Sequence, residues 1–212
     1  METFPTTEMT FTIPASHGVL EILTSPAQEN IPEKNITAII CHPHPLYGGT
    51  MYNKVVTTLA RTFRDLGMRT VRFNFRGIGK STGIFDEGRG EADDLVTVID
   101  WVKKIRPEDK IFLAGFSFGG FIAAKVAVTQ PPAQLVTVAP QVSRFIETKL
   151  PPIICPWILV HGEQDEIIPF SEVLLWYETL DPKPVFIRIP DAGHFFHGKL
   201  VELRSKLEEF LS

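Results

Sequence analysis

One serine stands between an apolar run typical of a strand and one typical of a helix, in the stretch "IFLAGFSFGGFIAAKVA" (residues 111–127). Ser117 lies in the pattern Gly-x-Ser-x-Gly, with Gly115 and Gly119 at the outer positions. Small residues suit a sharp turn there, because the strand and helix backbones then pass close together. The start of the following helix also stabilises negative charge. Ser117 is therefore a candidate nucleophile. The competing interpretation is a tight turn whose serine caps the helix.

A nucleophilic serine needs a base, and the base needs an acid that orients it. Asp165 follows the apolar run of "ILVHGEQDEIIPF", and His194 follows that of "FIRIPDAGHFF". The chain order serine, aspartate, histidine, each after its own strand, predicts a catalytic triad of Ser117, Asp165 and His194. Groups of the same kinds lie nearby at Glu163, Glu166 and His197. We prefer His194 because it stands at the exit of the last strand, and we expect His197 to face outward on the final helix.

Backbone N–H groups are expected to hold the oxyanion that forms when a serine attacks a carbonyl. One donor should be the N–H of Phe118, the residue after the serine. The other should come from the loop after "NITAIIC", which reads "HPHPLYGGTMYNK". Pro43 and Pro45 have no N–H. Leu46 is therefore the better candidate in this loop, and His44 is the second.

Two further patterns invite other interpretations. His42 and His44 alternate on a segment that is expected to be extended, as two metal ligands would, but no third ligand of matching spacing stands nearby. A structural role, with the ring nitrogens bound to backbone carbonyls, is favoured. The stretch "FRGIGKST" resembles the end of a phosphate-binding loop, but Asn74 stands where that loop requires glycine. We expect no metal and no nucleotide.

The elements that must position these residues alternate between strand and helix after an N-terminal hairpin. Strands are expected at residues 9–14, 18–24, 35–41, 68–75, 110–116, 134–140, 156–162 and 184–190. Helices are expected at residues 53–67, 89–105, 118–130, 171–180 and 197–212. This order predicts one α/β domain over residues 1–212. Its sheet is doubly wound and mostly parallel, with an N-terminal antiparallel hairpin and helices on both faces. Ligands bind such sheets outside the carboxyl ends of the strands, where the candidate residues fall.

Composition excludes several classes of protein. The 212 residues carry a formal net charge of −4 and 44% hydrophobic residues, which fits a chain with a packed core and gives no basic field for nucleic acid. No apolar run is long enough to span a bilayer, so we expect no membrane partner. The start "METFPTTEMTF" does not resemble a signal peptide. Cys41 and Cys155 are expected to be free core thiols, which points to a reducing cytoplasm.

With these residues in view, the chain resembles the α/β-hydrolase superfamily, and within it the small capless bacterial hydrolases close to dienelactone hydrolase. The resemblance runs from about Ile36 to the final helix, through the stretches "HPHPLYGGTMYNKVV", "FNFRGIGKSTG", "GFSFGG", "LVHGEQDEIIP" and "DAGHFF". It implies the roles of nucleophile for Ser117, base for His194 and orienting acid for Asp165, with Leu46 and Phe118 as oxyanion donors. Dienelactone hydrolase uses a cysteine as nucleophile, so its substrate does not carry over.

The resemblance also implies what the protein does. We expect a serine hydrolase without cofactor or metal, a carboxylesterase for small-molecule esters, acting as a monomer or homodimer. Many relatives insert a cap after the strand equivalent to residues 134–140; here "QVSRFIETKLPPIIC" leaves room for one short helix, so the site should be open, with apolar walls from Phe118, Phe145, Phe195 and Tyr47. Peptidase, thioesterase, lactonase or perhydrolase activity on the same triad stays open, as does a hydrolase-like module that only binds.

Overall fold

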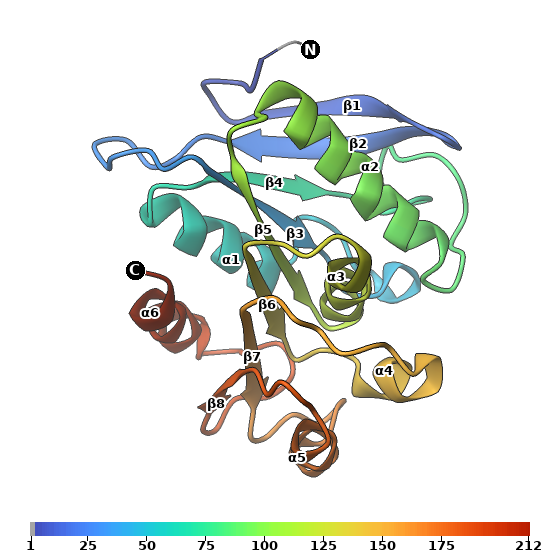
Figure 1. Cartoon of the computed structure of the whole chain (residues 1–212), viewed down its shortest axis with the longest axis vertical. Coiled ribbons are helices and arrows are strands. Elements are labelled where there is room, and N and C mark those ends of the chain that lie inside the picture. Colours follow the sequence, from blue (N-terminus) through green and yellow to red (C-terminus); the bar gives the residue numbers. More distant parts are fainter. Residues whose placement is uncertain (1–2) are drawn as a thin grey trace.

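The computed structural model describes residues 3–212, and an eight-stranded sheet runs through them (Figure 1). The strand order is β1-β2-β4-β3-β5-β6-β7-β8. Strands β1 and β2 form an antiparallel hairpin, β2 pairs antiparallel with β4, and the other pairs are parallel. The predicted fold class is therefore confirmed. The strands are β1 (Met9–Ala15), β2 (Gly18–Ser25), β3 (Ile36–Cys41), β4 (Arg69–Phe73), β5 (Lys110–Phe116), β6 (Gln134–Val138), β7 (Trp157–Gly162) and β8 (Val185–Ile189).

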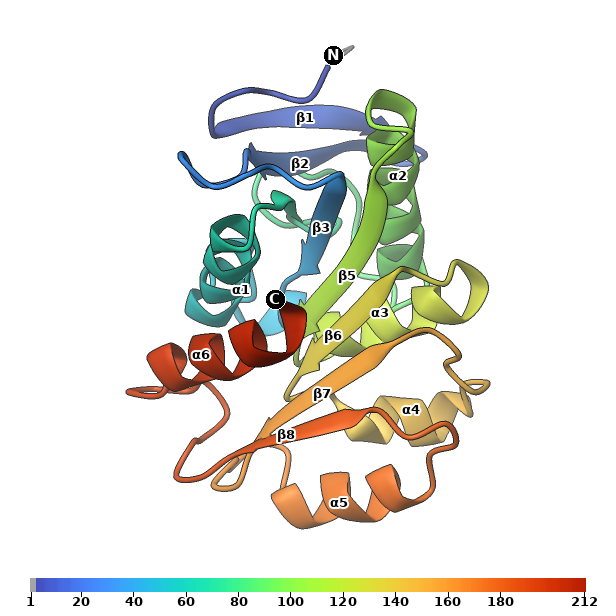
Figure 2. The same cartoon turned by 60° about the vertical axis from the view of Figure 1, so that its left-hand side comes forward.

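Helices cover both faces of the sheet, and each face has its own buried apolar cluster (Figures 1 and 2). Two helices lie on one face, α1 (Lys54–Asp65) and α6 (Leu200–Leu211). The other face carries α2 (Gly90–Ile105), α3 (Phe118–Thr129), α4 (Val142–Thr148) and α5 (Phe170–Glu178). A strand buried on both faces needs apolar residues at successive positions, which is why β3 and β7 are mostly apolar, with Thr37 and His161 as buried polar residues.

Several predicted boundaries differ from the structure by one or two residues, and the start of the final helix differs by three. The final helix was expected from residue 197, but α6 begins at Leu200. Phe196 and Gly198 have φ values of +53° and +71°, so the chain turns twice before a helix can start. His197 lies in this turn and is exposed, as expected, although it is not on the helix.

The parallel strands β5, β6, β7 and β8 all end at one edge of the sheet, toward the lower left in Figure 2. The loops that leave this edge carry Ser117, Asp165 and His194. Residues 139–156 join β6 to β7 and contain the short helix α4, so no cap domain is inserted there. The edge of the sheet is left without a lid.

The structure also bears on the predicted cysteines, on membrane spans and on metal ligands. Cys41 and Cys155 are free and buried, as predicted. In residues 3–212 no helix is long and apolar enough to cross a membrane, and no group of three or more histidine, cysteine or acidic residues lies together as metal ligands would.

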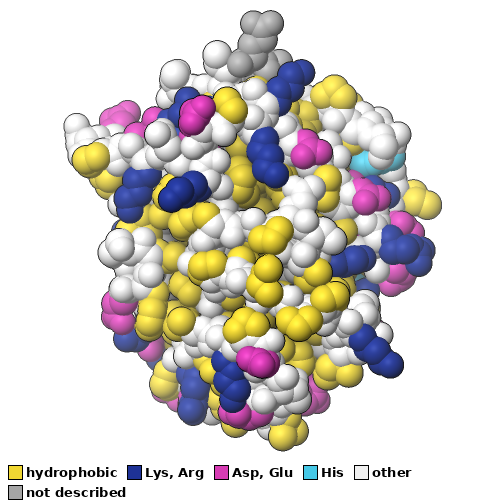
Figure 3. All heavy atoms as spheres, in the orientation of Figure 1, with side chains coloured by type: hydrophobic (Ala, Val, Ile, Leu, Met, Phe, Trp, Pro, Cys, Tyr) yellow, Lys and Arg dark blue, Asp and Glu magenta, His cyan; other side chains and the backbone are white. Residues whose placement is uncertain are grey.

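An apolar groove of about 910 Å³ lies between α4 and α5, and no sequence-predicted triad residue lines it. Hydrophobic side chains also gather across the middle of the face drawn in Figure 3.

Candidate active site

Ser117 occupies a strained turn between β5 and α3. Its φ and ψ are +55° and −120°, a conformation that residues with a Cβ rarely adopt. The turn brings the helix very close to the neighbouring strand β3: a Cβ at Gly119 would lie 2.4 Å from the carbonyl oxygens of Cys41 and His42. Only glycine fits there. The two glycines of the pattern thus serve the close approach that the sequence predicted, and the serine side chain does not cap the helix.

The structure brings together the three residues predicted as a triad. His194 Nε2 lies 3.2 Å from Ser117 Oγ, and His194 Nδ1 lies 2.8 Å from Asp165 Oδ2. A carboxylate can only accept a hydrogen bond, so Nδ1 carries the ring proton and Nε2 can accept from the hydroxyl. Asp165 and His194 are both buried, with 6% and 3% exposure.

Asp165 is held by the loop that carries it. Its Oδ1 accepts hydrogen bonds from the backbone N–H groups of Ile167 and Ile168, at 2.9 and 2.7 Å. Burial alone would raise the pKa of Asp165, but the hydrogen bond and charge of His194, with the Ile168 N–H, hold that pKa below its ordinary value. The carboxylate therefore stays ionised, as an orienting acid requires.

A second buried histidine, His161, lies against the same carboxylate. Its Nε2 is 2.9 Å from the Ile168 carbonyl oxygen and 3.4 Å from Asp165 Oδ2. Burial is the main cause that lowers the pKa of His161, so the ring is neutral at pH 7. The sequence analysis missed this residue. Its signal was weak, since a histidine inside an apolar strand reads as core.

The acidic neighbours of Asp165 have different places. Glu163 forms an ion pair with Arg188 on the surface. Glu166 lies closer to the site, because its Oε2 accepts a hydrogen bond from the backbone N–H of His194 at 3.0 Å. Neither glutamate contacts the His194 ring by a hydrogen bond in the described residues. Of these three acids, Asp165 contacts the His194 ring and Glu166 holds the His194 backbone.

We expect Glu166→Ala to lower kcat by about tenfold with little change in KM, because a base that is loosely held spends less time in reach of the nucleophile. Glu166→Gln keeps an oxygen that can accept the His194 N–H, so it should retain most of the activity. Steady-state kinetics on a chromogenic ester would measure both. Glu163→Ala is the matched control, since it removes a neighbouring carboxylate that faces solvent. Equal losses in Glu163→Ala and Glu166→Ala would contradict the anchoring role.

The backbone N–H groups of the two predicted oxyanion donors differ in their hydrogen bonds. Phe118 is the first residue of α3, so its N–H belongs to the end of the helix that has no intrahelical acceptor. Leu46 lies in the short 3₁₀ turn Pro45–Tyr47, and its N–H donates to His44 Nδ1 at 3.3 Å. Burial and the charge of Arg144 lower the pKa of His44, which keeps the ring neutral and able to accept. The Leu46 N–H is therefore engaged by His44 in this structure.

His42 ties the same loop to the segment just after β4. It is fully buried: its Nδ1 lies 2.6 Å from the Pro43 carbonyl oxygen, and its Nε2 accepts the N–H of Phe75 at 3.0 Å. Both ring nitrogens are thus used by the backbone, in the structural role favoured from the sequence. One partner is an N–H donor, where two carbonyls were expected. Burial is the main cause that lowers the pKa of His42 to about 4.

This histidine should make stability depend on pH. The unfolded chain binds its proton near pH 6.5, whereas the folded chain does so near pH 4, so stability falls as pH falls through that window. Between about pH 7 and about pH 4.5 the loss from His42 should be roughly 2–3 kcal/mol. Urea unfolding at both values, for the wild type and His42→Asn, would measure it. The variant should be less stable near pH 7 but lose less on acidification. An equal loss in both proteins would rule His42 out as the cause.

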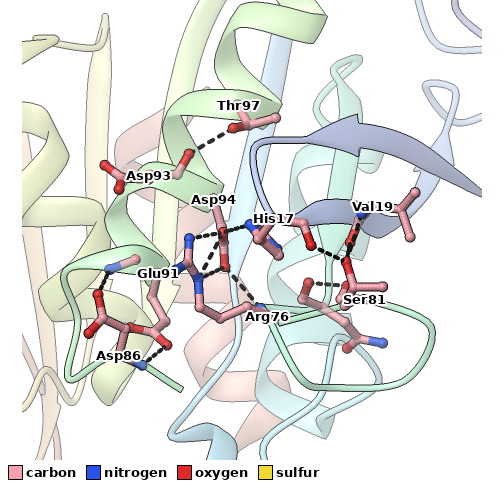
Figure 4. Close-up of polar contacts among 12 residues, drawn as sticks. His17, Val19, Arg76, Ser81, Asp86, Glu91, Asp93, Asp94 and Thr97 are labelled. Atoms are coloured by element: carbon pink, nitrogen blue, oxygen red, sulfur yellow. Dashed lines mark hydrogen bonds and ion pairs between the residues drawn. The ribbon is translucent and has the colours of Figure 1, made fainter. Parts of the chain in front are cut away.

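The stretch that resembled a phosphate-binding loop is pinned by buried charges. Asp94 accepts from the backbone N–H of Arg76 at 2.9 Å and from its guanidinium at 2.7 Å, and His17 Nδ1 lies 3.7 Å from the same carboxylate (Figure 4). Glu91 accepts from the N–H groups of Asp86 and Gly88. These contacts fix the loop between β4 and α2, and the Phe85 ring of this loop lies 5.9 Å from the ring of Phe118, the residue after Ser117.

The predicted apolar walls are half wrong. Phe118 is fully buried, because its ring packs against Phe75, Phe85 and His44. Phe145 is buried against Trp176 and lines the groove between α4 and α5. Tyr47 and Phe195 are exposed and remain candidates for the rim. The sequence shows that these residues follow strands, but it does not show whether their side chains point into the core or toward solvent.

Comparison with known proteins gives this geometry its context. Residues 39–145, half of the chain, match the family described as "Serine aminopeptidase, S33". An α/β serine hydrolase homologue from Coxiella burnetii is 47% identical, with a TM-score of 0.95, and the match covers 99% of this chain and all of that one. The chain belongs to the α/β serine hydrolases. The resemblance to this superfamily that the sequence suggested is thereby confirmed.

Two other relatives of this α/β-hydrolase are informative. XC6422 from Xanthomonas campestris, described as an α/β serine hydrolase without lid, is 41% identical with a TM-score of 0.93, covering 98% of this chain and 94% of that one. The lysophosphatidylserine lipase ABHD12 of Rattus norvegicus is 26% identical over 80% of this chain. The match spans 56% of that lipase, so this hydrolase corresponds to about half of it.

Proposed function

We propose that this α/β-hydrolase is a carboxylesterase that cleaves small esters through a covalent acyl-enzyme. Ser117 is the nucleophile, His194 the base and Asp165 the acid that orients the base. The observation that carries the proposal is the chain of contacts from Ser117 Oγ through the His194 ring to Asp165, at 3.2 and 2.8 Å. A binding module has no need of a base beside a serine, so this chain of contacts favours chemistry over binding alone.

The reaction follows from the positions of these groups. Ser117 Oγ attacks the carbonyl carbon while its proton passes to His194 Nε2. The ester C–O bond then breaks, and the leaving alcohol takes that proton from His194. Water enters, gives a proton to the same nitrogen and attacks the acyl-enzyme; the acid leaves as the proton returns to Ser117. Each proton moves through His194, so no cofactor is required.

Backbone donors would stabilise the charge on the carbonyl oxygen. Phe118 supplies a free helix-end N–H next to the nucleophile. Leu46 is the second donor that we propose, and its N–H must turn from His44 toward the substrate. The bond to be given up is long, at 3.3 Å, and its acceptor is uncharged. A small rotation of the 3₁₀ turn upon substrate binding is therefore part of this proposal.

The other functions open to the same triad are tested with it. The matching family is described as a serine aminopeptidase, which makes amide cleavage the main alternative; thioesters and lactones follow. The relative named a lysophosphatidylserine lipase supports an ester as the scissile bond. The short connection between β6 and β7 supports an open site for small or protruding acyl groups. Two free thiols support the cytoplasm as the location, and a monomer or a homodimer is compatible with the proposal.

Covalent labelling followed by a substrate panel would test this function. A fluorophosphonate should add one adduct to the intact protein, and peptide mapping should place the adduct on Ser117. Ester, thioester, lactone and aminoacyl-amide substrates of similar size should then be compared by kcat/KM, with esters expected to be best. No adduct on a folded protein would reject a nucleophilic Ser117 and favour a binding module. An adduct together with preference for aminoacyl amides would support the peptidase.

A further inference from the structure

Large apolar side chains on the loops near the candidate site face solvent. Six of them lie on the loops that leave the carboxyl edge of the sheet. Their exposed fractions are 66% for Leu46, 87% for Tyr47, 56% for Tyr52, 82% for Ile84, 54% for Ile167 and 38% for Phe195. Such side chains are ordinary when single, but a group of this kind marks a surface that another body covers. We call these six residues the apolar rim.

Ring contacts connect two members of the rim, and the neighbour of a third, to the residues beside Ser117 and to His194. Tyr47 packs on the His44 ring at 4.7 Å, and that ring lies 4.9 Å from the ring of Phe118, next to the serine. Ile84 precedes Phe85, whose ring is 4.9 Å from the same histidine. On the other side, Phe195 follows the base His194 and lies 5.1 Å from its ring.

Two further members of the apolar rim are placed by their neighbours. Ile167 donates its N–H to Asp165 Oδ1, so it stands beside the orienting acid. Tyr52 precedes Asn53, which lines a small hollow together with Phe195. The rim therefore comes from the loops after β3, β4, β7 and β8, which leave the same edge of the sheet as the loop that carries Ser117.

Buried hydrogen bonds anchor two loops of the rim at their bases, and the loop of residues 42–53 is uncharged. From residue 42 to residue 53 the chain contains no lysine, arginine, aspartate or glutamate. His42 fastens this loop to Phe75, and Asp94 fastens the loop that carries Ile84 through Arg76. A collapse of these side chains into the core would break those buried bonds. The apolar rim stays exposed until something covers it.

The position of the rim selects what can cover it. A rigid protein surface seated on all sides of Ser117 would close the mouth and exclude substrate. A single small ester touches one or two of the six side chains and leaves the others in water. A lipid–water surface covers the whole rim and presents ester bonds at the same time. Tyrosine also suits that boundary, because it has an apolar ring and a polar tip. The uncharged loop fits a lipid surface of no net charge.

We propose that the apolar rim docks this hydrolase on a zwitterionic lipid surface and that its substrates are esters presented there. The inference rests on the proposed function and names its substrate class. A peripheral contact of this kind needs no spanning helix. It departs from our sequence-based expectation of no membrane partner, which rested on the lack of an apolar run long enough to span a bilayer.

Vesicle binding separates this proposal from the catalytic one. Ser117→Ala protein would be sedimented with phosphatidylcholine vesicles, so that binding is measured without turnover. We expect measurable partition that salt does not weaken, and Ile84→Ser should lower the partition coefficient about fivefold, since it removes one apolar side chain from the buried area. Tyr52→Ser is a second variant with the same expected direction. Ile154→Ser is the matched control: it is 76% exposed but lies between α4 and β7, away from the rim.

Hydrolysis rates on emulsified and dissolved esters give a second test of the proposal. With Ser117 intact, Ile84→Ser should slow hydrolysis of emulsified tributyrin at least about threefold and leave dissolved p-nitrophenyl acetate unaffected. Absence of vesicle binding, or equal losses in Ile84→Ser and Ile154→Ser, would overturn the proposal. Self-association that Ile84→Ser abolishes would also overturn it, in favour of a second copy as the occupant. Vesicle binding without fluorophosphonate labelling would reject the catalytic function alone.

Discussion

Ser117→Ala should lower kcat on any ester by about 10⁴-fold or more while the protein stays folded. Within residues 3–212 the Ser117 hydroxyl is the group that hydrogen-bonds to His194 Nε2, with its oxygen 3.2 Å from that nitrogen, and it is our proposed nucleophile. Residual hydrolysis would come from water activated by His194 and from any oxyanion donors left in place. Initial rates on a chromogenic ester, with the variant purified free of wild type, would measure the loss.

The fold should tolerate this change because alanine keeps the Cβ of serine. The same unusual backbone, with φ at +55°, is imposed on both residues, so its strain is unchanged. The free energy of unfolding should therefore stay within about 0.5 kcal/mol of the wild type, by urea titration. Activity within a factor of ten of the wild type would show that another residue is the nucleophile. A large loss of stability would leave the kinetic result uninterpretable, so Ser117→Cys, which retains a nucleophile, is a useful companion.

Gly119→Ala should destabilise the protein by about 3–5 kcal/mol, one of the largest effects available to a single methyl group. The added carbon would sit 2.4 Å from two backbone oxygens, those of Cys41 and His42. Backbone cannot move aside as a flexible side chain does, so α3 must separate from β3. That separation would also move Phe118 away from the loop of Leu46 and reduce activity.

Gly120→Ala is the matched control for this prediction. Both glycines lie in the first turn of α3, and alanine is the better helix former at both positions. A Cβ at Gly120 would meet its neighbours at 3.2 Å, which small shifts can accommodate. Its effect should be within about 1 kcal/mol. Urea unfolding of the two variants compares them directly, and similar stabilities would mean that the close approach at Gly119 is not needed.

The fold was predictable because its signals are local and repeated. Apolar runs such as residues 110–116 and the amphipathic pattern of residues 89–105 gave strand and helix positions close to those of β5 and α2. The start of α6 was misplaced by three residues, since the positive φ of Phe196 leaves no mark in its residue type. Parallel strands ending at one edge then brought Ser117 near His194 without any contact being known in advance.

The details of the site were less predictable, because they depend on contacts between distant segments. Glu166 and Asp165 are adjacent acids in the sequence, yet only the structure shows that one holds the backbone of His194 and the other its ring. The Leu46 N–H is turned to His44 by the geometry of a single short turn. Phe118 follows the serine but is buried, because three other aromatic rings close around it. Residue type alone does not encode such choices.

The strand β8 forms one edge of the sheet, so it pairs with a neighbour on one side only. His194 lies in the loop that follows this strand. Edge strands detach at a lower free energy than central ones, and the rest of a sheet can survive their loss. A brief release of β8 and α6 would carry His194 away while β3, β5 and β6 remain paired. Because such a release removes the histidine but leaves the central strands paired, we expect activity under mild stress to fade before the bulk of the protein unfolds.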